Sequence, residues 1–134
     1  MKSVSTVIIY PMTTDADLQQ LAEEEYCYLT TIGRVSGKPH RIEIWFALDG
    51  RTAFLLSGGT HNSDWVKNVK KEASVQVRIA KRSFRGRARV VTGAEEGQKA
   101  RQLLAAKYYS WRPSRRLNSW ARTALPIALD LEME

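Results

Sequence analysis

The sequence predicts a small antiparallel β-barrel with helices around it, an α+β fold in which strands dominate. Several short runs of β-branched, aromatic and other apolar residues are separated by turns that contain Gly, Asp or Ser. Three other segments carry apolar residues at helical spacing instead. The 134 residues are the length of one domain, and no linker or internal repeat divides them. We therefore expect a single domain over residues 1–134.

Six strands are expected, at 26–32, 41–48, 52–57, 74–80, 84–92 and 126–131. The dipeptide Asp49-Gly50 predicts a two-residue hairpin between the second and third strands. A three-residue turn over 81–83 is expected between the fourth and fifth strands. Helices are expected at 14–25, 64–72 and 94–109. The Arg- and Trp-rich segment 110–124 has no clear period, so its structure and role stay open.

The chain is basic, with 21 Lys and Arg against 14 Asp and Glu and a net charge of +7. Such an excess favours an anionic partner: a nucleotide, a phosphorylated cofactor, a nucleic acid or an acidic membrane surface. Arg85, Arg87 and Arg89 share one face of a predicted strand, which is the pattern of a nucleic-acid-binding barrel. Few aromatic residues interleave with them, and we expect no nucleic-acid partner.

Cys27 is the only cysteine, so the chain can form no internal disulfide and has no Cys-based metal motif. We expect a buried thiol without a catalytic role, and no metal site. No apolar run is long enough to span a bilayer, and the N-terminus does not read as a secretory leader. These features predict a cytoplasmic protein.

Two Gly-bearing polar loops are the most informative feature of the sequence. Arg34, Ser36, Gly37 and Lys38 form the first loop, after the first strand; Ser57, Gly58 and Gly59 form the second, just before a predicted helix. Open backbone N–H groups, hydroxyls, basic side chains and a helix N-terminus together suit a phosphate-bearing ligand. The other interpretation is an ordinary solvated turn, because Ser-Gly-Lys-Pro is common turn chemistry.

The segments around these loops resemble a known family. The matching pieces are TTIGRVSGKPH at 30–40, IEIWF at 42–46, Gly58-Gly59, DWVKN at 64–68, ARVVTG at 88–93 and LPIALDL at 125–131. Together they resemble the deazaflavin (F420)-dependent nitroreductase and quinone reductase family, within the FMN-binding split β-barrel, or pyridoxamine 5'-phosphate oxidase-like, superfamily. The pieces span most of the chain and are specific only in combination.

The resemblance implies a six-stranded antiparallel split β-barrel that forms a homodimer with the cofactor in a groove between subunits. It also implies an oxidoreductase that transfers a hydride between reduced coenzyme F420 and a small acceptor such as a quinone, a nitroaromatic compound or an enone. FMN is the alternative cofactor, because no single residue excludes it. A non-catalytic cofactor-binding or nucleic-acid-binding barrel is the alternative function. The sequence does not identify the acceptor.

The expected cofactor site has three parts. The first loop (Arg34, Ser36, Gly37 and Lys38) binds the anionic tail; the strand residues Arg41, Ile44, Trp45 and Phe46 form the floor; and Ser57, Gly58, Gly59, Asn62 and Asn68 supply further polar contacts. For Phe46 a place in the core is the favoured alternative. Tyr108 and Tyr109 are the weak catalytic candidates, as donors of a proton or a hydrogen bond to the acceptor. Packing of their helix onto the barrel explains both tyrosines equally well.

Overall fold

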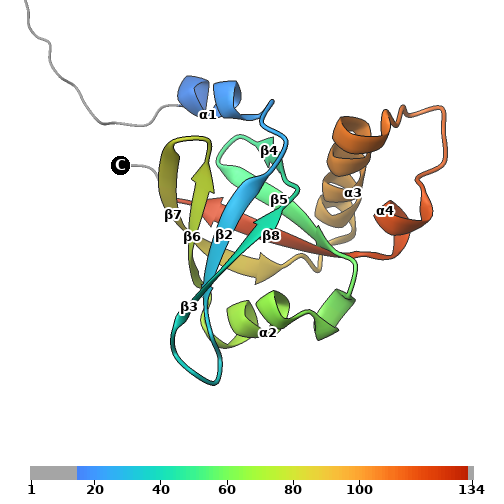
Figure 1. Cartoon of the computed structure of the whole chain (residues 1–134). Coiled ribbons are helices and arrows are strands. Elements are labelled where there is room, and N and C mark those ends of the chain that lie inside the picture. The colour runs from blue at the N-terminus through green and yellow to red at the C-terminus, as the bar shows by residue number, and fades with distance from the viewer. Residues whose placement is uncertain (1–14, 133–134) are drawn as a thin grey trace, which may run out of the picture.

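The structure is a computed structural model that describes residues 15–132. Within these residues the chain forms one curled antiparallel sheet of seven strands, with four α-helices and a short 3-10 turn around it (Figure 1). The strands are β2 (Cys27–Ile32), β3 (Pro39–Ile44), β4 (Ala47–Asp49), β5 (Thr52–Ser57), β6 (Ser74–Ile79), β7 (Arg82–Val90) and β8 (Leu125–Leu131). Their order across the sheet is β3-β2-β6-β7-β8-β5-β4. The predicted α+β class with an antiparallel split barrel is confirmed.

The expected count of six strands is wrong, because the run 41–48 divides in two. β3 pairs with β2 at one edge of the sheet, whereas β4 pairs with β5 at the other edge. Only Trp45 and Phe46 lie between them, so the sheet must curl until its two edges approach each other at this link. The sequence alternates smoothly here, but Phe46 and Ala47 are both buried, which breaks the period of two.

The β4–β5 and β6–β7 hairpins both have two-residue turns. β4 and β5 pair up to Asp49 and Thr52, so a two-residue hairpin forms as predicted. Its turn is Gly50-Arg51, one residue beyond the expected Asp49-Gly50, and Gly50 has φ +60°. β6 and β7 pair up to Ile79 and Arg82, so the expected three-residue turn over 81–83 is wrong. The turn there is Ala80-Lys81, and Ala80 has φ +54°.

The helices follow the predicted segments with one addition. α2 (Asp64–Lys71) and α3 (Ala94–Tyr109) match the expected ranges to within one residue. α1 (Asp15–Leu21) ends before the three glutamates at 23–25, and the expected first residue of this helix, Thr14, lies outside the described residues. α4 (Ser119–Thr123) forms in the segment that was left open, and the Asn118 side chain caps it by accepting from the Ala121 amide at 3.0 Å.

Two apolar clusters hold these elements together. The larger fills the curled sheet and includes Leu29, Phe46, Leu55 and Val77. The smaller lies between β5, β8 and α3 and includes Phe54 and Leu104. Cys27 belongs to the first cluster and is fully buried, as predicted. No helix in residues 15–132 is both long enough and apolar enough to cross a bilayer.

Candidate functional site

A cavity of about 480 Å³ lies between the first Gly-bearing loop, β3 and α2. The loop is closed by the Gly33 amide, which donates to the Lys38 carbonyl at 2.8 Å. A Cβ on Gly33 would lie 2.6 Å from Nε2 of His40 and 2.7 Å from Oγ of Ser36, so any other residue there would displace both side chains. The lining includes basic, hydroxyl and aromatic side chains, among them Arg34, Ser36, His40, Arg41, Trp65 and Asn68. This cavity offers donors and positive charge at one end of β3.

Arg34 fastens the loop to α2. Its guanidinium donates to the Asn68 side-chain oxygen at 3.0 Å, to the Asp64 carboxylate at 3.1 Å and to the Asp64 carbonyl at 3.4 Å. A guanidinium has five N–H donors, so two stay available to a ligand in the cavity. The side chain is 33% exposed. Arg34 can therefore hold the loop in place and bind an anion in the same position.

Asn68 is the buried polar centre of this region, with 4% of its surface exposed. Its oxygen accepts from the backbone N–H of Arg34 at 3.1 Å as well as from the guanidinium, and its amide donates to Oγ1 of Thr31 at 3.1 Å. Every polar atom of the side chain thus has a protein partner, as a buried amide requires. Asn68 orders the loop, and the second N–H of its side-chain amide can still donate to a ligand in the cavity.

A second cavity, of about 270 Å³, lies at the other end of β3. Its lining is mostly apolar and aromatic and consists of Tyr26, Glu43, Ile44, Trp45, Leu56 and Trp120. Leu56 is 4% exposed and belongs to the floor, whereas Tyr26 is 37% exposed and belongs to the rim. Trp120 comes from α4, and its Nε1 would lie 3.7 Å from a Cβ on Gly58, so the second Gly-bearing loop borders this cavity.

Stacked aromatic rings fix the position of Trp45. The Tyr108 ring lies parallel to the Trp45 indole, with centroids 4.3 Å apart and an interplanar angle of 4°. The rings of Trp120 and Tyr109 meet the same indole edge-on, at 5.7 and 6.0 Å. α3 and α4 together build this aromatic wall, which holds one face of the cavity rigid.

α3 also holds the link between β3 and β4 by its backbone. The Tyr108 hydroxyl accepts from the Phe46 amide at 3.1 Å and lies 3.0 Å from the Phe46 carbonyl and 2.5 Å from the Glu25 carbonyl. The Lys107 amine donates to the Phe46 carbonyl at 2.9 Å. Burial raises the pKa of Tyr108 to about 12 and lowers the pKa of Lys107. These two side chains replace the strand partners that Phe46 lacks.

The polar groups of the second Gly-bearing loop form hydrogen bonds largely with one another. The Ser57 hydroxyl donates to the Thr60 carbonyl at 2.9 Å and lies 2.7 Å from the Ser63 hydroxyl. A Cβ on Gly59 would lie 2.5 Å from the Ser63 Oγ. The Asn62 amide donates to the Gly59 carbonyl at 3.0 Å, and its side chain is exposed. The loop is a compact wall beside α2, with Gly58 as its open backbone position.

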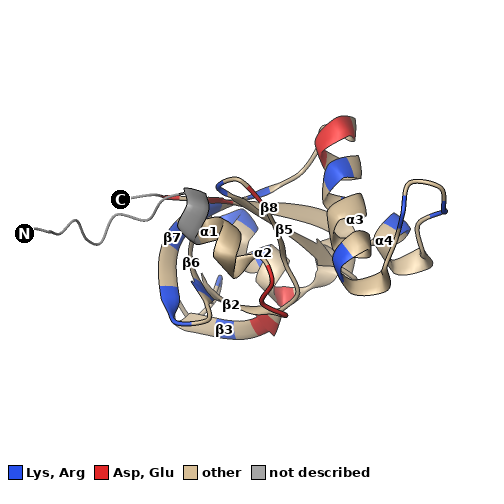
Figure 2. Ribbon diagram, turned by 90° about the horizontal axis from the view of Figure 1, so that it is seen from above, with Lys and Arg blue, Asp and Glu red and all other residues tan. Residues whose placement is uncertain are grey.

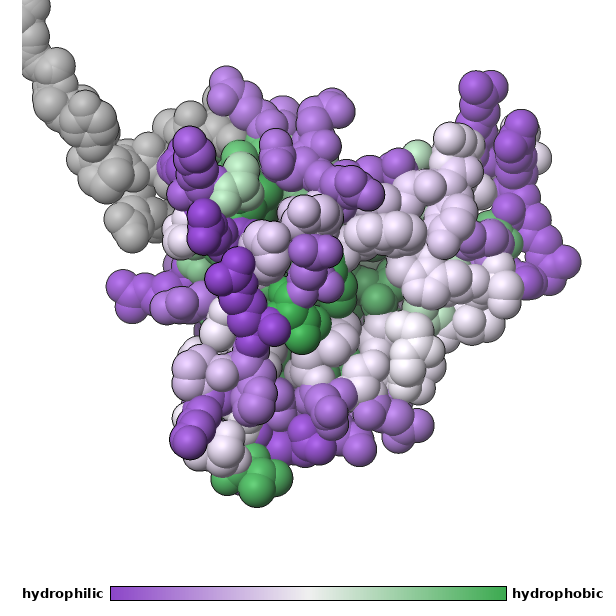
Figure 3. Space-filling model, viewed as in Figure 1, coloured by the Kyte–Doolittle hydropathy of each residue, from purple (hydrophilic) through white to green (hydrophobic). Residues whose placement is uncertain are grey.

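The two cavities follow each other along β3, and we refer to them together as the trough. Ile42 lines the basic cavity, and the next two residues, Glu43 and Ile44, line the aromatic one. From His40 to Ile44 an extended strand rises about 13 Å. Figure 3 shows apolar surface in the middle of this face, bordered by hydrophilic side chains. Since β3 is an edge strand, it also offers backbone groups that no other strand occupies. An elongated ligand with an anionic tail and a planar apolar head fits this donor set.

The comparison with known families decides the classification. The model of the F420H(2)-dependent quinone reductase family matches residues 6–132. The chain belongs to this family. An F420 reductase has the same fold at 20% identity and a TM-score of 0.60, over 85% of this chain and 92% of the other. A domain-swapped dimer matches at 20% identity and 0.62, over 78% and 79%.

The fold extends to flavin-binding proteins. An FAD-binding protein from Mesorhizobium loti has the same fold as this chain, at 12% identity and a TM-score of 0.62. Each of the two chains is covered over 86% of its length. At these identities the solved structures show that the fold is shared, while the family model carries the classification.

The predicted site residues of this family member fall into three groups. Four of them line the basic cavity (Arg34, Ser36, Arg41 and Asn68), and Ile44 and Trp45 line the aromatic one. Gly37, Lys38 and Asn62 are exposed and line neither of these cavities, and Ser57, Gly58 and Gly59 form the second loop. Phe46 is fully buried in the core, and Tyr108 stacks on Trp45. Both Tyr108 and Trp45 line a further cavity, of about 730 Å³, between α3, β4 and the loop after α1.

In the aromatic cavity, four lining residues were not among the predicted site residues: Tyr26, Glu43, Leu56 and Trp120. Their positions depend on the curl of the sheet and on α4. One signal was available, because Asn118 and Ser119 before the short run that contains Trp120 are typical of a helix start.

Proposed function

We propose that this protein is an F420-dependent reductase whose cofactor lies in the trough along β3. The observation that supports it is the meeting of a basic, hydroxyl-bearing cavity and an aromatic cavity at consecutive residues of one edge strand. When reduced F420 is bound, it supplies a hydride, and an acceptor such as a quinone takes up that hydride and a proton to become the hydroquinone.

The basic cavity is the part of the trough that suits the anionic tail. Arg34 keeps two N–H donors there, and Ser36, His40 and Arg41 add a hydroxyl, an imidazole and a second guanidinium. Asn68 and Asp64 fix the orientation of the Arg34 guanidinium before any ligand arrives. Such preorganisation lowers the entropy lost on binding.

The aromatic cavity is the part that suits the planar head. Ile44 and Leu56 give it an apolar floor, and the Trp45 indole is held by its stack on Tyr108. The Tyr108 hydroxyl is engaged by backbone groups of Phe46 and Glu25. We therefore propose that Tyr108 positions Trp45, and that Tyr109, which is 48% exposed, is the better placed of the two tyrosines to reach an acceptor.

Direct titration tests the cofactor assignment. We expect the purified chain to bind F420 more tightly than FMN, and the bound, reduced F420 to be oxidised on addition of menadione. Arg34→Ala should weaken F420 binding by about 1.5–3 kcal/mol, the size of one charge-assisted hydrogen bond. Lys67→Ala is the matched control, because Lys67 is an exposed cation on α2 outside both cavities.

Circular dichroism of Arg34→Ala separates lost binding from lost folding, because Arg34 also anchors α2. Equal affinity of wild type and folded Arg34→Ala would contradict the tail assignment. Tighter binding of FMN, with flavin-dependent turnover, would replace F420 by FMN. If neither F420 nor FMN binds and single-stranded nucleic acid binds in a salt-sensitive way, the binding-module alternative is favoured.

We also propose that the chain forms a homodimer through the outer face of β2 and β3. Tyr26 and Ile32 leave 37% and 36% of their surfaces exposed on this side, and a fold relative is a domain-swapped dimer. Sedimentation equilibrium should give twice the monomer mass, and Ile32→Glu should reduce it. A monomer at all concentrations would contradict this proposal.

A further inference from the structure

Charge changes sign along the trough. The first-loop end carries Arg34, His40 and Arg41 in its lining and Lys38 beside it. The aromatic end carries no basic residue in its lining, and its charged member is Glu43. In Figure 2 the loop after α1 is also acidic, and it contains Glu23, Glu24 and Glu25. The two ends of one trough therefore select ligands of different charge.

Glu43 is an exposed carboxylate at the mouth of the aromatic cavity. No residue in 15–132 forms an ion pair or hydrogen bond with its side chain. The nearest cation on its own strand, Arg41, places its guanidinium 4.1 Å from the centroid of the Tyr28 ring instead. The carboxylate thus acts on whatever enters the cavity.

The negative charge of Glu43 also affects the pKa of Tyr26. Its pKa is raised first by a hydrogen bond with Tyr28 and further by the negative charges of Glu43 and Glu25. The rim of the cavity is therefore both aromatic and negative. Aromatic faces and a carboxylate attract planar cations and tolerate planar neutral molecules, and they repel planar anions.

We infer that Glu43, at the rim of the aromatic cavity, makes the protein select neutral or cationic planar acceptors against anionic ones of the same shape. The inference rests on the proposed function, because it takes the acceptor to approach the planar head of the cofactor from this rim. An acceptor of that kind leaves the basic end of the trough free for the anionic tail. Glu43 is thus a specificity-determining residue that acts by charge.

Three naphthoquinones of one ring system test this: menadione, a naphthoquinone sulfonate and a naphthoquinone with a trimethylammonium side chain. Their binding to the cofactor-free protein is followed by quenching of tryptophan fluorescence, since Trp45 and Trp120 line the cavity. Their kcat/KM values are then measured with reduced F420. We expect the cationic compound to exceed the sulfonate by roughly three- to tenfold in both measurements at low salt.

Glu43→Gln keeps the shape and removes the charge, so it should abolish this preference, and Glu43→Lys should reverse it. Glu95→Gln is the matched control, because Glu95 is an exposed carboxylate in the first turn of α3 outside both cavities. Circular dichroism verifies that each variant is folded. Equal binding of the three compounds by wild type, or an unchanged preference in Glu43→Gln, would overturn the inference.

The two readouts separate this inference from the proposed function. One outcome is a charge preference in the quenching titrations that disappears in Glu43→Gln while no F420-dependent turnover is detected. That result would support the charge selection and overturn the reductase assignment. Turnover without charge preference would do the opposite.

Discussion

Ala80 is one of three described non-glycine residues with a positive φ. It lies in the two-residue turn between β6 and β7 with φ +54°, a region in which a side chain on an L-residue crowds the following carbonyl. Gly50 meets the same demand in the β4–β5 turn without a side chain. Both turns thus need a residue with a positive φ, and only the β4–β5 turn has glycine at that position.

Ala80→Gly should therefore raise the free energy of unfolding. Relief of the left-handed strain exceeds the added flexibility of glycine in the unfolded chain, which leaves a gain of about 0.5–1 kcal/mol. Urea denaturation measures it. Ala73→Gly, at a position outside the positive-φ set, is the control and should lower stability instead. A loss in both variants would contradict the strain.

Cys27 makes stability depend on alkaline pH. Burial raises the pKa of its thiol to about 12, from an ordinary value near 9. The folded state keeps the proton while the unfolded state releases it, so its contribution is complete below pH 9 and is lost as the pH rises to about 12.

We expect the free energy of unfolding to fall above pH 9, with Cys27 contributing a slope of up to about 1.4 kcal/mol per pH unit. Cys27→Ala should show a shallower fall in this range and the same slope as wild type between pH 6 and 8. Tyr108, with its pKa of about 12, leaves part of the decline in the variant. Parallel curves for wild type and Cys27→Ala up to pH 11 would contradict the buried thiol.

At the scale of elements, α4 is the helix whose stability depends most on contacts with other elements. It has five residues, too few to be stable alone, and depends on side chains from outside. Arg101 of α3 donates from one nitrogen to the carbonyls of Ala121, Arg122 and Ala124 at 2.8, 2.9 and 2.8 Å. These are carbonyls at the end of α4 that need partners. Arg101 thereby holds Trp120 against Trp45.

Arg101→Met should release α4 from α3. We expect acrylamide to quench tryptophan fluorescence more strongly, and planar quinones to bind less tightly, with most of the fold retained. Arg116→Met, in the exposed loop before α4, removes the same charge and should change neither quantity. Unchanged quenching in Arg101→Met would show that α4 is held by other contacts.

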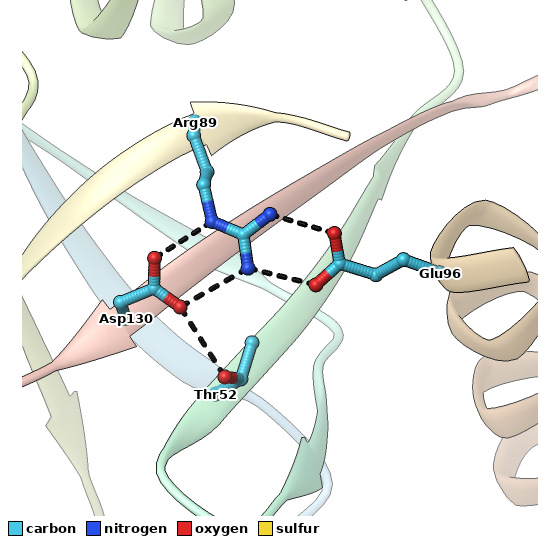
Figure 4. A network of polar contacts seen from close by, with 4 residues as sticks. All are labelled: Thr52, Arg89, Glu96 and Asp130. Atoms are coloured by element: carbon cyan, nitrogen blue, oxygen red, sulfur yellow. Dashed lines mark hydrogen bonds and ion pairs between the residues drawn. The ribbon is translucent and has the colours of Figure 1, made fainter. Parts of the chain in front are cut away.

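At the scale of the whole molecule, a polar network joins elements far apart in the sequence. The Arg89 guanidinium on β7 donates to Glu96 of α3 at 2.6 and 2.7 Å and to Asp130 of β8 at 2.7 and 3.2 Å, and Thr52 of β5 donates to Asp130 at 3.3 Å (Figure 4). It lowers the pKa of Glu96 and of Asp130. The network fixes α3 to the sheet.

Arg89→Lys should lower the free energy of unfolding by about 1 kcal/mol, because an ammonium cannot form both bidentate contacts and the network is partly exposed. Since the carboxylate pKa values are lowered in the folded state, this contribution is present near neutral pH. It falls as the pH drops below the ordinary values of 4.5 for Glu96 and 3.8 for Asp130, toward the lowered folded-state values. Arg85→Lys, on the same face without these partners, is the control. Equal losses at neutral and acidic pH would contradict the ion pairs.

The curl of the sheet is the property that the linear pattern could not reveal. Alternation along 41–48 predicts one strand, but Phe46 and Ala47 are both buried, and the chain changes partner strands there. A propensity describes one strand at a time, whereas the change of partner depends on how the far edge of the sheet returns. The aromatic cavity arises from that return, since Leu56 and Trp120 meet Trp45 only across it.

By itself the sequence determined the antiparallel strands, the long helix, the buried cysteine and the basic first loop, because each follows from local spacing and turn chemistry. Only the tertiary structure decided that Arg34 is tied to α2, that the run 41–48 changes partner strands, and that Glu43 stands beside two tryptophans. These contacts join residues that are distant in the chain, and their geometry depends on closure of the whole sheet.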